Sequence, residues 1–120
     1  MAAEALALCR IQEVEQTRAA QLDLRKLLFL KRLPPELERL TSLQRLNLSE
    51  CVQLSDLSPL AGLISLQTLD LSYCTQLTSV DALKDLRNLR SLYLTNTHQF
   101  PTDAINELRK QLPQTHIIYP

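Results

Sequence analysis

The sequence contains very little glycine, few aromatic residues and no tryptophan. Gly62 is the only glycine among 120 residues, and without a glycine-rich loop the backbone cannot cradle phosphate groups, which excludes a nucleotide-binding loop here. Two Phe and three Tyr leave little aromatic surface on which bases or sugars could stack. The 13 basic residues are balanced by 13 acidic ones, so the uniform positive field that favours phosphate backbones or anionic lipid is missing. We therefore expect neither a nucleic-acid partner nor a membrane partner.

Long hydrophobic runs are also missing. The run from Leu27 to Leu30 is followed at once by Lys31 and Arg32, whereas about 20 apolar residues are needed to span a bilayer. The first ten residues carry Glu4 and lack a basic leader and a typical cleavage site, so they do not predict a secretory signal. The expected location is the cytoplasm, with a secreted effector as the alternative.

Cysteine and histidine are too few and too scattered for a catalytic or metal site. The three cysteines, Cys9, Cys51 and Cys74, make an odd count in a chain long enough to fold without disulfides, which is typical of a reducing compartment. They form no CxxC pair, and the only histidines, His98 and His116, are not clustered, so a zinc site lacks ligands. A nucleophile also needs an adjacent base held by a third group. We expect no enzymatic activity and no cofactor.

Leucine, in contrast, recurs with a strict period. Leu43, Leu66, Leu89 and Leu112 are each 23 residues apart, and the pattern Leu-x-x-Leu-x-Leu begins at the first three of them. The second and third leucines of the triplets are Leu46 and Leu48, Leu69 and Leu71, and Leu92 and Leu94. A fourth copy is degenerate, and we align its Leu112, Thr115 and Ile117 with the triplet that begins at Leu89.

An earlier copy precedes these by 24 residues. Leu22 and Leu24 align with Leu46 and Leu48, and the pair Pro34-Pro35 accounts for the additional residue. A Leu-x-Leu segment alternates with period 2 and therefore predicts a short strand with its leucines on one face. That face is removed from water only if the next unit stacks beside it. A bundle of amphipathic helices is a less favoured alternative, because the helical period does not reproduce this triplet at a constant interval.

The segment Leu66-Gln-Thr-Leu-Asp-Leu-Ser-Tyr-Cys-Thr-Gln-Leu77 resembles the consensus of the leucine-rich-repeat family, and the resemblance extends from Gln21 to the C-terminus. It implies an α/β solenoid, a right-handed coil with a parallel, concave sheet of about five strands. Cys51 and Cys74 occupy the position where the family places Asn or Cys to bond neighbouring backbone. The resemblance therefore implies two buried thiols, with a bridge between adjacent coils as the less favoured alternative.

Both ends of the repeat array are expected to be capped, because stacked coils expose an apolar cross-section at each end. We divide the single domain 1–120 into an N-terminal cap, 1–20, repeats, 21–100, and a C-terminal cap, 101–120. Residues 2–16 predict an amphipathic helix that lies across the first coil through Leu8, Ile11 and Val14, with Cys9 packed there too.

The C-terminal cap is expected to combine a helix and a strand. Thr102 is the expected N-cap of the helix, and Ile105, Leu108 and Leu112 form its apolar stripe. Pro113 ends this helix, and residues 115–119 add the last strand.

The residues between the strand leucines point away from the core and line the concave, solvent-facing surface of the sheet, here called the sheet face. Tyr93 is the best anchor among short polar neighbours. Five strands at about 4.8 Å spacing extend only about 20 Å along the stack, which is small for an ordinary specific interface of about 800 Å² per partner. We therefore expect the loops at Glu50, Tyr73 and Asn96, or further domains, to contribute to the binding surface. The candidate partner-binding residues are Asp23, Arg25, Arg45, Asn47, Thr68, Asp70, Tyr73, Ser91, Tyr93 and His116.

We predict a non-catalytic, monomeric module that binds a protein partner. The segments Leu33-Pro-Pro-Glu-Leu and Leu57-Ser-Pro-Leu-Ala-Gly-Leu63 resemble repeats of bacterial multidomain signalling proteins, including Roco-type GTPases and NTPase immune sensors, which implies the sensor region of a larger protein. The alternative is a substrate-recognition domain of an enzyme, such as a ubiquitin-ligase-type effector or a GTPase, whose catalytic part is absent. A third hypothesis is a structural or oligomerising role.

Deletion of residues 1–18 tests the role of the N-terminal cap. Each coil depends on its neighbour for burial, so we expect the deletion to unfold the whole array rather than fray one end. Circular dichroism during heating measures this, and an unchanged thermal midpoint would contradict the expectation.

Overall fold

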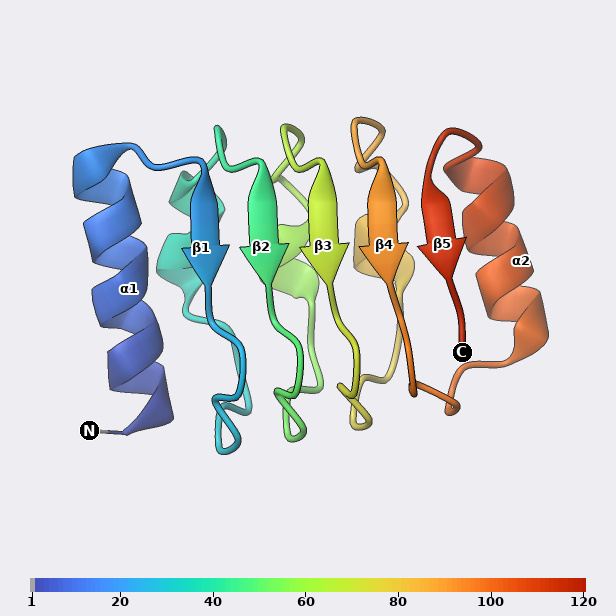
Figure 1. The fold of residues 1–120 in the computed structure, drawn as a ribbon, viewed down its shortest axis with the longest axis horizontal. Helices are drawn as coiled ribbons and strands as arrows, with labels where there is room; N and C mark the ends of the chain where they lie inside the picture. Colours follow the sequence, from blue (N-terminus) through green and yellow to red (C-terminus); the bar gives the residue numbers. More distant parts are fainter. Residues whose placement is uncertain (1) are drawn as a thin grey trace.

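The computed structural model describes residues 2–120, and its strands form one parallel sheet in the order β1-β2-β3-β4-β5 (Figure 1). The strands are β1 (Gln21–Asp23), β2 (Arg45–Asn47), β3 (Thr68–Asp70), β4 (Ser91–Tyr93) and β5 (His116–Ile118). Short 3-10 turns lie behind the sheet on the return path of three coils: η1 (Pro35–Arg39), η2 (Ser58–Leu60) and η3 (Asp81–Leu83). Helices α1 (Ala3–Thr17) and α2 (Thr102–Gln111) lie at the two ends of the stack. This is the expected capped solenoid.

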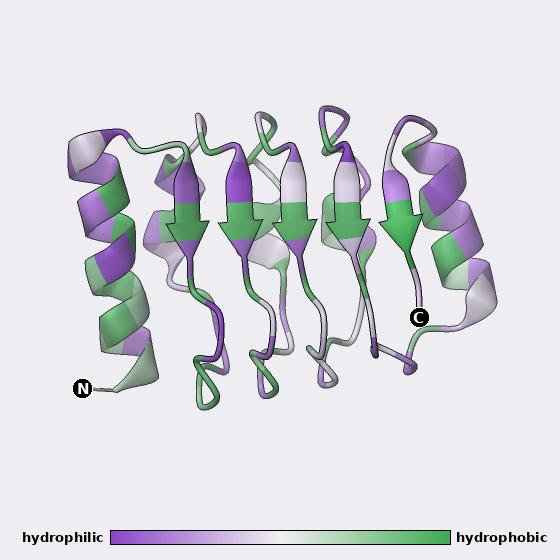
Figure 2. Ribbon diagram, viewed as in Figure 1, coloured by the Kyte–Doolittle hydropathy of each residue, from purple (hydrophilic) through white to green (hydrophobic). Residues whose placement is uncertain are grey.

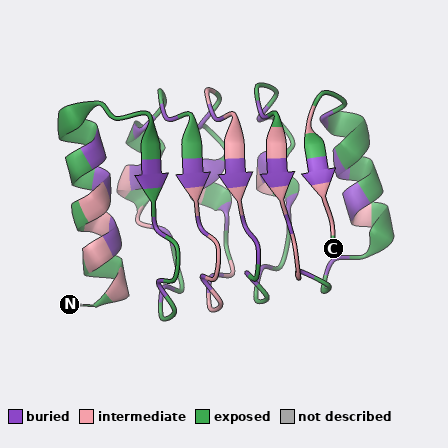
Figure 3. Ribbon diagram, in the orientation of Figure 1, coloured by how far each residue is buried: buried purple, intermediate pink, exposed green. Residues whose placement is uncertain are grey.

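The central residue of every strand faces the core. Leu46 pairs in register with Leu22 on one side and with Leu69 on the other, and Leu92 pairs with Ile117. All five are buried, as the strand centres in Figure 3 show. Figure 2 shows the same centres as a hydrophobic band across the sheet. A leucine in this band is removed from water by the coils on both sides, and each fully buried leucine contributes about 1.5–3 kcal/mol.

Hydrogen bonding between coils continues past the three-residue strands. The amide of Leu48 donates to Asp70 O (2.8 Å), that of Glu50 to Ser72 O (2.8 Å), and that of Tyr73 to Thr95 O (2.9 Å). Glu50 and Tyr73 have φ values of 62° and 64°, in the left-handed region, which costs about 1–2 kcal/mol for a residue with a side chain. The hydrogen bonds from Glu50 and Tyr73 to the next coil hold this conformation, in which the chain turns away from the sheet.

The extra residue of the first coil lies where the prolines are. η1 begins at Pro35 and contains five residues, whereas η2 and η3 contain three each. Pro at the first position of a helical turn has a favourable φ and no amide to satisfy. In the next two coils, side-chain oxygens accept the first amides of the turns: Asp56 Oδ1 from Ser58 N and Ser79 Oγ from Asp81 N, both at 3.0 Å.

Helix α1 covers the first coil through a slightly different face from the predicted one. Ile11 and Val14 are buried as expected, but the third buried residue is Ala7, while Leu8 is half-buried. The small side chain of Ala7 lies one turn before Ile11 on the same side of the helix. Leu8 is rotated away from that line. The prediction that Cys9 packs in the cap is wrong, since Cys9 is exposed.

The C-terminal cap has the predicted helix and strand, with two corrections. Thr102 is the first residue of α2, and Pro101 occupies the N-cap position without a side-chain hydrogen bond. Ile117 pairs with Leu92 rather than aligning with Leu94, so the last repeat interval is 25 residues instead of 23. The reason is that α2, ten residues long, replaces a three-residue 3-10 turn and needs more chain for its return.

We expect Leu69→Ala to lower the free energy of unfolding by about 2–5 kcal/mol, because it opens a cavity between the two neighbouring coils. Leu28→Ala is the matched control, because Leu28 is 47% exposed and should change stability by only about 0.5 kcal/mol. Urea unfolding followed by circular dichroism measures both variants. Equal losses in the two variants would show that the Leu46–Leu69–Leu92 row is not the centre of the core.

Candidate functional site

The sheet register brings candidate residues of all five strands side by side. One column consists of Asp23, Asn47, Asp70 and Tyr93, each paired with the next across adjacent strands. The neighbouring column consists of Gln21, Arg45, Thr68, Ser91 and His116. The strand centres between these columns are buried, so both columns lie on the face opposite the return path, which Figure 1 draws behind the sheet.

His116 is in the second column, next to Ser91, whereas the sequence placed it next to Tyr93. That prediction is wrong for the same reason as the register of the last coil: two additional residues follow α2. Ile118 takes the place beside Tyr93. The exposed imidazole of His116 therefore belongs to the start of the last strand rather than to the centre of the sheet face.

Three of the first-column residues also have a role inside their own coil. The Oδ1 atoms of Asp23, Asn47 and Asp70 accept hydrogen bonds from the amides two residues later, at 3.0, 3.0 and 2.9 Å. Asp and Asn favour such local turns because their short side chains reach the backbone two positions on. One side-chain oxygen of each residue thus helps to shape the strand exit, while the other polar atom of the side chain is not used in this turn.

A shallow depression of about 250 Å³ lies on the sheet face over β1, β2 and β3, with Tyr93 of β4 at its border. Its lining includes Arg45, Asn47, Thr68, Asp70 and Tyr93. Acidic, basic, amide, hydroxyl and phenol groups therefore meet within one patch. Such a mixed, open surface can hydrogen-bond to and pack against the side chains of another protein.

The two remaining candidates lie at the strand exits. Arg25 is exposed and its Nε lies 3.3 Å from Asp23 Oδ2, so the pair is formally neutral. Tyr73 is in the left-handed turn three residues after β3 and is 46% exposed. These residues border the sheet face without forming part of its columns.

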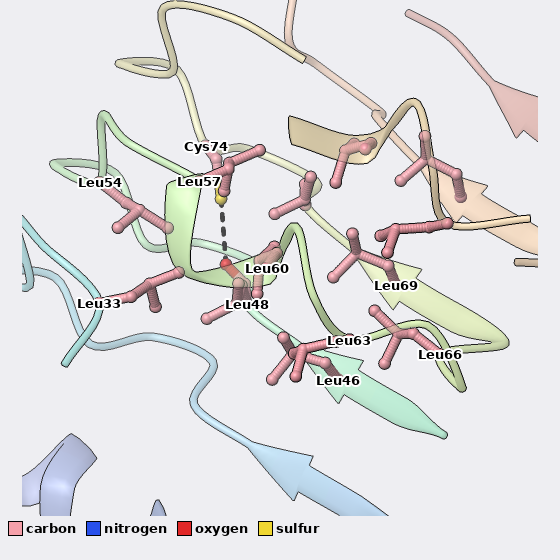
Figure 4. Packing of buried hydrophobic residues seen from close by; sticks show 14 of the residues in the cluster. Leu33, Leu46, Leu48, Leu54, Leu57, Leu60, Leu63, Leu66, Leu69 and Cys74 are labelled. Carbon is pink, nitrogen blue, oxygen red and sulfur yellow. Dashed lines mark hydrogen bonds between the residues drawn. The ribbon is translucent and has the colours of Figure 1, made fainter. Parts of the chain in front are cut away.

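Cys51 and Cys74 form the expected links to the preceding coils. The Sγ of Cys51 donates to Leu24 O (3.2 Å) and that of Cys74 to Leu48 O (3.0 Å), the latter drawn in Figure 4 among the packed leucines. Both cysteines are free rather than bridged. Thr97, in register with them, instead donates from its hydroxyl to Leu94 O within its own coil.

Burial dominates the acidity of both thiols. It raises the pKa of Cys51 from 9.0 to about 11 and that of Cys74 to about 12, because desolvation disfavours the thiolate. An acid whose folded-state pKa lies above its unfolded value binds its proton more tightly in the native state. These cysteines therefore favour the native state below pH 9, and that contribution is lost as the pH rises toward 11 and 12.

Residues 2–120 contain neither a cluster of potential metal ligands nor a membrane-spanning helix. No group of three or more His, Cys, Asp or Glu side chains in this range is close enough to hold a metal ion. Within the same residues, neither helix combines the length and apolar composition needed to cross a bilayer.

A second, larger depression was not predicted from the sequence. It has a volume of about 630 Å³ and lies where the strands begin, with Gln44, Gln67, Arg87 and Arg90 in its lining. Gln44, Gln67 and Arg90 occupy equivalent positions in three successive coils, directly before the second column. The repeat period would have identified three of these four residues, because each of Gln44, Gln67 and Arg90 directly precedes a residue of the second column.

The fold and the repeated surface define a solenoid repeat protein, and sequence comparison identifies its repeats. A family model described as leucine-rich repeats (2 copies) matches residues 64–110. Intervals of 23 and 24 residues and the same coil geometry extend the repeat over the two preceding strands. Residues 64–110 thus carry leucine-rich repeats, and residues 2–120 have the fold of a leucine-rich-repeat solenoid. No curated protein matches the chain.

Solved leucine-rich-repeat structures are similar to most of the chain. A leucine-rich-repeat protein of Leptospira interrogans is 26% identical, with a TM-score of 0.72, over 91% of this chain and 27% of that protein. Internalin C2 of Listeria monocytogenes is 23% identical, with a TM-score of 0.64, over 96% and 62% of the two chains. This chain thus spans less than two thirds of either neighbour. The repeats and these neighbours support a protein-interaction module in general and point to a non-catalytic repeat domain.

We expect only Cys9 to react with Ellman's reagent in the native protein at pH 8. Cys51 and Cys74 are buried and their pKa values lie well above that pH, so the reactive thiolate is scarce and inaccessible. The native protein should release one equivalent of 2-nitro-5-thiobenzoate, and the denatured protein should release three equivalents. Cys9→Ser is the control and should remove the native reaction. Fast reaction of a second thiol would contradict the buried ladder.

Proposed function

We propose that the chain is a non-catalytic module that binds a protein partner through the sheet face, with Tyr93 as the central anchor. The main support for this proposal is that Arg45, Asn47, Asp70 and Tyr93 lie together around one shallow depression. Aromatic and arginine side chains contribute most often to the energy of protein interfaces, particularly near their centres.

The dimensions of the molecule support this proposal. Its principal extents are 37, 26 and 17 Å, and the sheet face lies in the plane of the two longer ones (Figure 1). An ordinary specific interface buries about 800 Å² per partner, which exceeds the strands alone. A partner that also contacts the strand-exit turns, including Tyr73 and Glu50, would reach that area.

The rigidity of the sheet also favours recognition. The backbones of β2, β3 and β4 are each paired with a strand on both sides, and the Asx turns at Asn47 and Asp70 hold the strand exits. A preorganised surface loses little conformational entropy on binding. Exposed residues can therefore differ between repeats without changing the geometry in which they are presented.

The finer parts of the proposal concern the setting of the module. We infer that it is a monomer and that it serves as the sensor region of a larger signalling protein. The free thiols of Cys9, Cys51 and Cys74 accord with a reducing location such as the cytoplasm. Light scattering of the purified chain tests the monomeric state, and a dimer at micromolar concentration would refute it.

The double variant Tyr93→Ala/Asp70→Asn tests binding through the sheet face. Asn retains the Oδ1 atom that accepts the amide of Ser72, so the strand exit is preserved while the charge and the aromatic ring are removed. We expect affinity for a partner isolated from the native source to fall at least about 10-fold, equivalent to about 1.4 kcal/mol. Calorimetry or interferometry with the purified partner measures this.

Lys84→Ala/Asp85→Asn is the control, because both residues are exposed on the return path that follows η3. This variant should bind the partner as the unmodified protein does. Unchanged affinity in the sheet-face variant, with native circular dichroism, would refute the proposal.

A further inference from the structure

A groove of concentrated positive charge follows the edge of the sheet where the strands begin, the upper edge in Figure 1. It combines the depression of about 630 Å³ with an adjoining one of about 430 Å³, and the two share Arg87 and Gln114. We call it the edge groove and define it by Gln44, Gln67, Arg87, Arg90, Lys110 and Gln114.

The charge of the edge groove is of one sign. Arg87, Arg90 and Lys110 line it, and no Asp or Glu of the described chain is in its lining. The two ion pairs found among residues 2–120, Arg25–Asp23 and Lys26–Glu50, both lie at the opposite, strand-exit edge. Although the chain has no net charge, basic residues within 2–120 are thus unpaired along the strand-start edge and paired with acidic residues at the strand-exit edge.

The backbone beneath the groove is held by the ladder between coils. The amide of Gln67 donates to Gln44 O and that of Arg90 to Gln67 O, both at 2.7 Å, and the amide of His116 donates to Arg90 O at 2.8 Å. Because these backbone groups are paired with one another, the amide and guanidinium side chains above them are available to a ligand. Their spacing is set by the strand spacing of about 4.8 Å.

The corner beside the groove adds an apolar contact. Asn88 lines the groove and its Nδ2 donates to Ile64 O at 2.9 Å, which ties two successive corners together. Ile64 is 58% exposed at that corner. A ligand in the groove therefore meets cationic and amide groups, with the exposed Ile64 hydrogen-bonded through its carbonyl to Asn88 at the groove's border.

We propose that the edge groove binds an acidic, extended segment of the protein partner, with Arg87 and Arg90 pairing with its carboxylates. A planar guanidinium can donate two parallel hydrogen bonds to a carboxylate. The side-chain amides of Gln44, Gln67 and Gln114 can donate to and accept from a peptide backbone. An open groove lined by amides suits a chain of peptide groups better than a small molecule, which requires enclosure. This inference rests on the proposed protein-binding function and names the chemistry of the partner.

The test uses the full chain and a fluorescein-labelled peptide of three Glu-Leu-Glu-Ser repeats, with its Gln-for-Glu counterpart as the neutral reference. Fluorescence anisotropy should show binding of the acidic peptide, weaker binding of the neutral one, and loss of affinity as ionic strength rises from about 0.05 to about 0.5 M. Arg87→Gln/Arg90→Gln should weaken binding of the acidic peptide at least about 10-fold.

Arg32→Gln/Arg39→Gln removes the same charge from exposed positions outside the groove and should retain the affinity. Equal losses in the two variants, or equal binding of the acidic and neutral peptides, would overturn the proposal. Tighter binding of an oligothymidylate than of the acidic peptide would also overturn it, in favour of a phosphate ligand. The assay needs no native partner, so its failure leaves partner binding at the sheet face to be judged by the Tyr93→Ala/Asp70→Asn experiment.

Discussion

The structure depends on the fact that no coil can bury its own leucines. Each strand has three residues, of which only the central one points inward. In β2, β3 and β4 this side chain is shielded from water by the equivalent side chains of the two adjacent coils. Hydrogen bonds reinforce this dependence in both directions along the stack. Backbone amides such as that of Leu48 donate forward to the next coil, while the thiols of Cys51 and Cys74 donate back to the preceding one. The array therefore behaves as one unit, closed by α1 and α2 where there is no further coil.

The same stacking explains how function can be separated from folding. Inward positions are almost all leucine, whereas outward positions change from Arg45 to Thr68 to Ser91 in successive strands without altering the register. The outward residues are not wholly free, because Asp23, Asn47 and Asp70 also accept a backbone amide of their own coil. Two surfaces of different character result: a sheet face of mixed charge and an edge groove of positive charge. Their difference is hidden in the zero net charge of the chain.

Sequence periodicity predicted the first four coils well because the leucines of each strand identify the register, even where the first interval is one residue longer. The column from Asp23 to Tyr93 is confirmed residue by residue. The predicted register of the last coil was wrong because Thr115 and Ile117 are poor markers of the repeat. The longer return through α2 pairs His116 with Ser91, two positions before the predicted partner Tyr93. At the other end, Ala7 rather than Leu8 packs on the first coil, since the closest approach of a helix is decided by its orientation and not by side-chain size alone.

The sequence by itself determined that the chain is a capped leucine-rich solenoid and which strands are neighbours, because both follow from a repeat whose apolar residues must meet their equivalents. The burial of Cys51 and Cys74 followed from the resemblance of their repeat position to that of the leucine-rich-repeat family. Only the tertiary structure decided where the surface is hollowed and how its charges are grouped. Arg87 and Arg90 belong to a corner and a strand start, and Lys110 belongs to α2. No local pattern brings these three together. Their proximity is produced by the path of the chain around the last coil, which the period of the leucines does not describe.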